Sequence, residues 1–144
     1  MSLEGAYDDQ NTFAKIVRGA APATVIAETD ATLAFMDVFP QSRGHCLVIP
    51  KAGGARNLFD VDPATLGAVT AEVQRIARAV RDGLKPDGVR IAQFNGEPAG
   101  QTVFHLHFHI IPIYADEALG AHASGGPAGA DVLEPLAEKI RAAL

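Results

Sequence analysis

TVFHLHFHII, the sequence of residues 102–111, holds three histidines that alternate with apolar residues. Such alternation is typical of a β-strand, because successive side chains on a strand point to opposite faces of the sheet. We therefore predict a strand from Thr102 to Ile111, stopped by Pro112. Its buried face carries Phe104, Leu106, Phe108 and Ile110. The other face carries His105, His107 and His109, with neighbouring histidines about 6.5 to 7 Å apart.

Three histidines on one face have three explanations. An exposed polar face would mix Ser, Thr, Lys and Glu rather than repeat one residue type. A zinc or iron site takes imidazole ligands, and three-histidine zinc centres occur. However, consecutive rings on one strand rarely all reach a single ion, and no carboxylate lies nearby in the sequence to complete the site. The third explanation is phosphate chemistry, in which the rings converge on one phosphate-sized ligand.

A glycine-rich turn directly before the histidines favours phosphate chemistry. Residues 95–102 have the sequence NGEPAGQT, in which Gly96 and Gly100 allow a ligand to approach the backbone closely. Backbone amides in such a bend can point at phosphate oxygens. Many glycine-rich turns only connect strands, so it is the position of this turn beside the histidines that gives it weight.

The remaining elements follow from periodicity and from capping residues. The helix from Pro63 to Arg81 has an apolar stripe at steps of three and four residues, Asp62 as N-cap and Gly83 as its end. The sequence also predicts helices at 12–18 and 133–144, and strands at 25–28, 32–36, 45–49 and 89–94. Mixed helices and short strands with several hairpins favour an antiparallel α+β domain over a doubly wound sheet.

Length, charge and cysteine content limit the possible functions. A chain of 144 residues has room for one ordinary domain. Its net charge of -5 and scattered basic residues argue against nucleic acid as a partner. Cys46 is the single cysteine, so an internal disulfide is impossible and a reducing cytoplasm fits. The acidic segment 1–10 has no apolar run, so we expect no signal peptide and no membrane association.

Residues 100–112, GQTVFHLHFHIIP, resemble the signature of the histidine-triad family. Residues 13–17, 35–38 and 44–51 resemble further blocks of that family in the same order. The likeness covers residues 12–114, flanked by a flexible N-terminus at 1–11 and by a mobile loop with a short C-terminal helix at 115–144. It implies a five-stranded antiparallel sheet with two main helices, and a homodimer formed through the long helix and a central strand.

The resemblance also implies roles for individual residues. His107 matches the nucleophile, and His105 or His45 would orient its ring, with a satisfied core histidine as the alternative for His45. Asp37 matches the carboxylate that holds the ribose hydroxyls. The phosphate ligands are Asn95, Gln101, Thr102 and His109, with amides of the turn around Gly100, and Thr102 also assists the leaving group. An apolar clamp for the purine is formed by Phe13, Ile16, Phe35 and Leu47, for which ordinary core packing is the alternative.

The implied activity is hydrolysis at the α-phosphate of a purine nucleotide through a nucleotidyl-histidine intermediate. His109 favours hydrolysis, because relatives that transfer the nucleotidyl group typically have Gln at that position. The leaving group could be an amine or a second nucleotide. The alternative is a regulatory or scaffold protein that binds nucleotides and hydrolyses them incidentally. We expect no cofactor and no metal, because Asn11, Ala14 and Gly53 or Gly54 stand where many bacterial relatives hold structural zinc.

Overall fold

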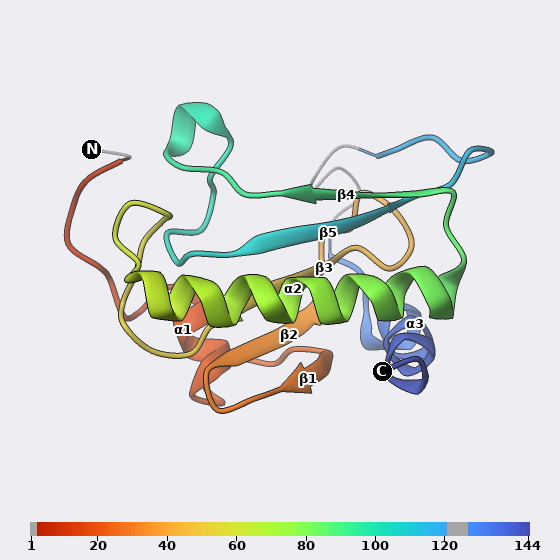
Figure 1. Cartoon of the computed structure of the whole chain (residues 1–144), viewed down its shortest axis with the longest axis horizontal. Helices are drawn as coiled ribbons and strands as arrows, with labels where there is room; N and C mark the ends of the chain where they lie inside the picture. Colours follow the sequence, from red (N-terminus) through yellow and green to blue (C-terminus); the bar gives the residue numbers. More distant parts are fainter. Residues whose placement is uncertain (1–2, 121–126) are drawn as a thin grey trace.

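A five-stranded antiparallel sheet forms the centre of the molecule, as predicted (Figure 1). The structure is a computed structural model that describes residues 3–120 and 127–144. Within these residues the strand order is β1-β2-β3-β5-β4, so that β1 and β4 lie at the two edges. The strands are β1 (Val25–Glu28), β2 (Thr32–Met36), β3 (Cys46–Pro50), β4 (Gly88–Ala92) and β5 (Phe108–Ile113).

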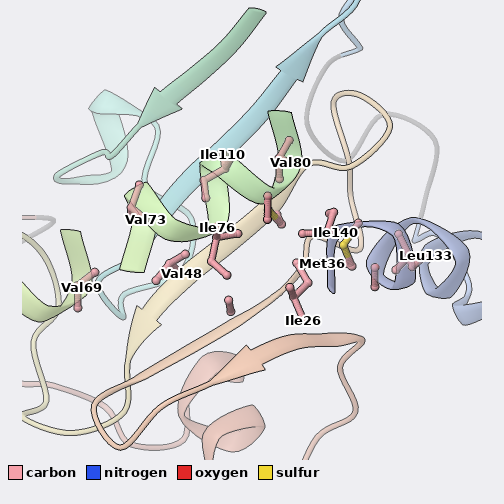
Figure 2. Packing of buried hydrophobic residues seen from close by; sticks show 14 residues of the cluster. Ile26, Met36, Val48, Val69, Val73, Ile76, Val80, Ile110, Leu133 and Ile140 are labelled. Atoms are coloured by element: carbon pink, nitrogen blue, oxygen red, sulfur yellow. The ribbon is translucent and has the colours of Figure 1, made fainter. Parts of the chain in front are cut away.

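Helices cover both faces of the sheet. The long helix α2 (Pro63–Leu84) and the C-terminal helix α3 (Ala130–Ala142) pack on one face (Figure 1). Figure 2 shows this core, in which side chains of α2 such as Val73 and Ile76 meet Val48 and Ile110 of the sheet. The short helix α1 (Thr12–Val17) contributes Phe13 to a second apolar cluster, which contains Leu33, Phe35, Leu47 and Ile49.

Strands β2 and β3 are buried along their whole length because each serves both clusters. Alternate residues of β2 and β3, such as Ala34 and Val48, face α2 and α3, whereas Phe35 and Leu47 face α1. Successive side chains point to opposite faces, and both faces are covered. Both strands are therefore mainly apolar in the sequence instead of alternating between apolar and polar residues. The α1 side of the sheet is the side on which the candidate site lies.

The long helix begins as predicted but ends later. The Asp62 carboxylate accepts a hydrogen bond from the Thr65 amide at 2.9 Å, as expected of an N-cap. The predicted end at Gly83 is wrong, because α2 continues to Leu84 and ends at Lys85, whose φ of 55° is left-handed. A Cβ atom on Gly83 would lie 2.5 Å from the Lys139 carbonyl oxygen of α3. This glycine therefore permits close packing of two helices.

The strand predicted from Thr102 to Ile111 is only partly correct. Residues 103–105 form a bend, residues 102, 106 and 107 are irregular, and β5 begins at Phe108. The backbone before β5 bonds to the loop after β3 instead of to a strand, since the Leu106 amide donates to the Ala55 carbonyl at 3.0 Å. Pro112 does not stop the strand. Pairing between β5 and β3 ends at Ile110. At Pro112, which has no amide hydrogen to donate, β5 pairs with β4 alone, so the missing donor is tolerated.

The C-terminal part begins beyond a gap in the described residues. Residues 121–126, within the predicted mobile loop, lie outside the part of the chain that the structure describes. The helix expected after this loop is present as α3 and buries Leu133, Ala137 and Ile140. A search of residues 3–120 and 127–144 finds no helix with the length and hydropathy needed to cross a membrane.

Candidate active site

A cavity of about 360 Å³ opens between α1 and the sheet. This volume lies in the range of small-molecule sites. All four residues predicted to clamp a purine line the cavity, and so do Asp37, Thr102, His107 and His109. Further lining side chains that the sequence did not single out are Thr12, Pro22, Ala23, Met36, Val38, Phe39 and Val103. One cavity thus combines an apolar lining with a carboxylate, two hydroxyls and two imidazoles.

His107 lies in the irregular segment just before β5 and is 6% exposed. Its Nδ1 is 2.7 Å from the main-chain oxygen of His105. A carbonyl can only accept, so Nδ1 carries the proton and the lone pair of the neutral ring is on Nε2. The Phe13 ring meets the imidazole edge-on, with centroids 5.0 Å apart and an interplanar angle of 89°. Backbone and aromatic contacts together fix the tautomer and the orientation of His107.

His109, the first inward-facing residue of β5, is held by a buried polar chain. The Gln41 amide donates to Nδ1 of His45 at 3.0 Å, so in the neutral ring the proton of His45 is on Nε2. That nitrogen lies 2.9 Å from Nδ1 of His109, which must accept. The proton of His109 is therefore on Nε2. His45 thus supports His109, and the His105 carbonyl orients His107.

Asp37 joins this chain from the end of β2. Its Oδ2 lies 3.3 Å from Nε2 of His45 and 4.0 Å from Nδ1 of His109, while Oδ1 accepts from the Phe39 amide at 2.8 Å. The residue is only 4% exposed, yet it lines the cavity. A carboxylate has about four acceptor positions. Asp37 can therefore accept hydroxyl groups of a ligand and keep these contacts.

His105 is set apart from the other two triad histidines, with which the prediction grouped it, although its ring also packs edge-on against Phe13. It is absent from the cavity lining, and its Nε2 donates to the Pro50 carbonyl at 2.9 Å. Its Nδ1 accepts from the Tyr7 hydroxyl at 2.7 Å. Burial lowers the pKa of His105, and the bond to Pro50 opposes this effect. The sequence placed His105 with the others because it assumed a strand where the chain bends.

Apart from Thr102 at its end, the glycine-rich turn braces the site instead of lining it. Gln101 is 1% exposed, and its amide bonds to Gly96, Arg56 and Val103 of the protein. Asn95 bonds to the Leu58 amide and to the Gln93 side chain. The Gly100 amide donates to the Glu97 carbonyl in the 3-10 helix η1 (Glu97–Ala99). None of the three lines the cavity, and their contact with phosphate stays a prediction.

One group of possible metal ligands lies beside the cavity in the described part of the chain. Donor atoms of Asp37, His45 and His109 lie within 4.8 Å of one another. The two imidazole nitrogens are already joined at hydrogen-bond distance. At the positions where the resemblance places zinc ligands in relatives, Asn11 caps α1 by accepting from the Ala14 amide at 2.9 Å, and Gly54 lies against the Tyr7 ring. The donor geometry is that of a hydrogen-bonded chain.

Tyr7 is the contact that sequence reasoning missed. It lies in the acidic N-terminal segment, which was expected to be flexible and carries no periodicity or motif. The same segment is held at two further points, because Asn57 donates to the Leu3 carbonyl at 3.0 Å and Arg56 donates to the Ala6 carbonyl at 3.2 Å. No local sequence signal connects residues 98 positions apart.

Comparison with known proteins agrees with this architecture. The HIT domain family model matches residues 18–116. The protein named hit from Bacillus subtilis is 41% identical over 71% of this chain and 70% of its own length. An adenosine 5'-monophosphoramidase, hnt1 of Schizosaccharomyces pombe, is 36% identical over 89% of this chain and 93% of its own. The crystal structure of a Hit-like protein from Bartonella henselae, described as involved in cell-cycle regulation, superposes with a TM-score of 0.88 at 47% identity and covers 96% of this chain and 100% of that one. The chain therefore belongs to the HIT domain family.

Proposed function

We propose that this protein hydrolyses a bond at the α-phosphate of a purine nucleotide, with Nε2 of His107 as the nucleophile. The observation that carries the proposal is the 2.7 Å hydrogen bond from Nδ1 of His107 to the His105 carbonyl. It leaves the lone pair on Nε2, in a residue that lines a nucleotide-sized cavity. Neutral imidazole with a fixed tautomer is a competent nucleophile near neutral pH.

The lining of the cavity supports a defined pose for the nucleotide. Phe13, Ile16, Phe35 and Leu47 supply apolar contacts for a flat purine. Asp37, at the end of β2, accepts the ribose hydroxyls. The α-phosphate then lies against Thr102, His107 and His109, which are polar side chains that line the same cavity.

The reaction proceeds in two displacements. Nε2 of His107 forms a bond to phosphorus while the bond to the leaving group breaks, and that group takes a proton from solvent through the Thr102 hydroxyl; the water that attacks in the second step gives one proton back. Water then attacks the nucleotidyl-histidine, releases the nucleoside monophosphate and restores neutral His107. The Nε2 proton of His109 and the Thr102 hydroxyl are the donors placed to stabilise charge on the phosphate oxygens. His45 and Asp37 keep the proton of His109 on that nitrogen.

An amine is the leaving group that we propose to test first. The Schizosaccharomyces relative is named an adenosine 5'-monophosphoramidase, and this name supports a phosphoramidate substrate. A dinucleoside polyphosphate has the same α-phosphate and the same purine, so it is the second substrate class. The two classes differ only in what departs from phosphorus.

We also propose that two copies associate through α2 and through β4, an edge strand in the single chain, where the resemblance implied a central strand. A groove of about 560 Å³ lies between these elements and is lined by Thr70, Val73, Gln74, Ala77, Arg78, Arg81, Pro86, Asp87, Gly88, Val89 and Ile91. Ile91 is 47% exposed on the edge strand. An exposed apolar residue on an unpaired edge is typical of a surface that another chain covers.

The deciding experiment compares wild type with His107→Ala on an adenosine phosphoramidate, with a chelator present. Positioned proton transfer and nucleophilic catalysis together predict a loss of turnover of at least about 10² to 10⁴ in the variant. Rapid quenching followed by intact-mass analysis should detect one nucleotidyl group on wild type and none on His107→Ala. The variant should still bind AMP, because the apolar clamp and Asp37 are unchanged.

Three outcomes would contradict the proposal in different ways. Turnover that persists in His107→Ala would remove His107 as nucleophile. Turnover that chelator abolishes in wild type would indicate metal-dependent hydrolysis. Stoichiometric nucleotide binding without turnover on phosphoramidates and dinucleotides would favour the regulatory or scaffold function instead.

A further inference from the structure

The N-terminal segment reaches the triad through one tyrosine. The Tyr7 hydroxyl lies 2.7 Å from Nδ1 of His105, and the two ring centroids are 5.8 Å apart. The Tyr7 ring rests over Gly54, where an added Cβ would lie 3.4 Å from the ring. Asn57 and Arg56 hold the carbonyls of the same segment. Tyr7 is therefore fixed both by its ring and by its flanking backbone.

The direction of the hydrogen bonds around His105 follows from its partners. Nε2 faces the Pro50 carbonyl, which can only accept, so Nε2 carries the ring proton. Nδ1 of the neutral ring must then accept, and the Tyr7 hydroxyl donates to it. Both ring nitrogens are satisfied although the residue is only 4% exposed. Phe13 packs against the same ring edge-on, at a centroid distance of 6.3 Å.

His105 is linked to His107 through one peptide group. The carbonyl of this group belongs to His105 and accepts from Nδ1 of His107 at 2.7 Å. The amide of the same planar group belongs to Leu106 and donates to the Ala55 carbonyl at 3.0 Å. A rotation of the His105 backbone would thus turn the acceptor of His107 away. The anchored His105 ring resists that rotation.

We propose that Tyr7 is a positioning residue, which holds the His105 ring so that the adjoining carbonyl keeps His107 oriented for attack. This inference rests on the proposed function of His107. Tyr7 does not line the nucleotide cavity. Loss of its hydroxyl should therefore lower the rate of the chemical step and leave substrate binding unchanged.

Tyr7→Phe is the direct test, because it removes the hydroxyl and keeps the ring over Gly54. Tyr114→Phe is the matched control. Tyr114 is the other tyrosine of the chain, and its hydroxyl donates to the Arg43 carbonyl at 2.8 Å, outside the cavity lining. We expect kcat on the phosphoramidate to fall about 10- to 100-fold in Tyr7→Phe, since small misplacements of reacting groups have effects of this size. KM should stay within about two-fold, and the control should match wild type in both constants.

Nitrogen-15 NMR of the imidazoles provides a measurement that does not depend on activity. In wild type and Tyr114→Phe we expect His105 to be protonated on Nε2 alone. In Tyr7→Phe we expect a mixture of tautomers or exchange broadening, because the buried Nδ1 has lost its donor. His107 should lose its single Nδ1-protonated signal in the same variant. Thermal melting of all three proteins identifies any general loss of folding.

Each combination of results decides the matter. Unchanged tautomers together with unchanged kcat would overturn the inference and leave the proposed function intact. Altered tautomers with wild-type kcat would reduce Tyr7 to a structural contact. A lower kcat with unaltered tautomers would exclude the route through His105. If wild type has no turnover, the proposed function fails, while the ring signals of His105 and His107 still test the positioning contact. Should Tyr7→Phe fold poorly, the double variant with His105→Asn is compared with His105→Asn alone. If Tyr7 acts through His105, adding Tyr7→Phe should cause no further loss of kcat in that background.

Discussion

Gln101 is a buried amide that ties the glycine-rich turn to the loop after β3. Its Oε1 accepts from the Gly96 amide at 2.9 Å, and its Nε2 donates to the carbonyls of Arg56 at 2.6 Å and Val103 at 3.1 Å. Gln101→Ala would leave these three backbone groups without the side chain. Because an unsatisfied buried polar group costs about 1 to 3 kcal/mol, we predict a loss of about 2 to 4 kcal/mol in the free energy of unfolding, measured with urea.

Gln10→Ala is the control for this prediction. Gln10 is exposed, and it should change the free energy of unfolding by less than about 0.5 kcal/mol. If Gln101→Ala unfolds at the wild-type urea concentration but binds AMP much more weakly, Gln101 acts as a phosphate ligand and not as a brace.

Residue types were easier to predict than side-chain directions. The apolar clamp, Asp37, Thr102, His107 and His109 line one cavity, as the resemblance implied. Asn95 and Gln101 have the right chemistry at the right place in the chain, yet their amides bond to nearby backbone. A linear motif does not indicate which of several reachable partners a side chain selects. The same limit applies to Tyr7, whose partner is 98 residues away.

At the scale of whole elements, local signals located most helices and strands. β1 and β2 occupy the predicted residues, and α1 differs from its prediction by one residue at its C-terminal end. The strand prediction was wrong for residues 102–107 because alternation of residue types also occurs in a chain that bends. The hydrogen-bond partner of this backbone lies in the loop after β3 and not on a neighbouring strand. The prediction that α2 ends at Gly83 was wrong because a glycine can also allow close contact between two helices. Both errors come from tertiary contacts that a local pattern does not contain.

At Gly83 we predict a change in stability opposite in sign to the one that helix propensity alone predicts for replacing Gly by Ala. In an exposed helix interior, replacing Gly by Ala stabilises by about 0.5 to 1 kcal/mol. At Gly83 the new Cβ would lie 2.5 Å from the Lys139 carbonyl oxygen and 3.5 Å from the Ala143 side chain. We therefore predict that Gly83→Ala lowers the free energy of unfolding by about 1 to 3 kcal/mol, because α3 must shift away from α2.

Gly67→Ala in the same helix is the matched control. Nothing lies within 4 Å of a Cβ added there, so this variant should gain stability by about 0.5 to 1 kcal/mol. Chemical denaturation of both variants gives the comparison. Equal gains at the two glycines would mean that α2 and α3 are not in close contact in solution.

At the scale of the whole molecule, the two edges of the sheet differ in how far other parts of the chain cover them. At β1, Arg141 of α3 donates to the Val25 carbonyl at 3.0 Å and covers part of the edge. At β4, Ile91 is 47% exposed beside the groove of α2. If a second copy covers β4, a charge at Ile91 should prevent association, because lysine on an edge strand opposes pairing between strands. We predict that wild type sediments as a dimer and Ile91→Lys as a monomer.

Val132→Lys controls for the added charge, since Val132 is 54% exposed on α3, away from β4. It should sediment like wild type. A dimer that persists in Ile91→Lys would show that the interface lies elsewhere on the molecule.

The activity of the monomeric variant then tests whether one chain is sufficient for nucleotide binding. The cavity and the groove beside Ile91 share no lining residue. The Ile91→Lys monomer should therefore keep a KM within about two-fold of wild type, because the groups that bind the nucleotide are unchanged. A large rise in KM on dissociation would mean that the partner subunit contributes to nucleotide binding.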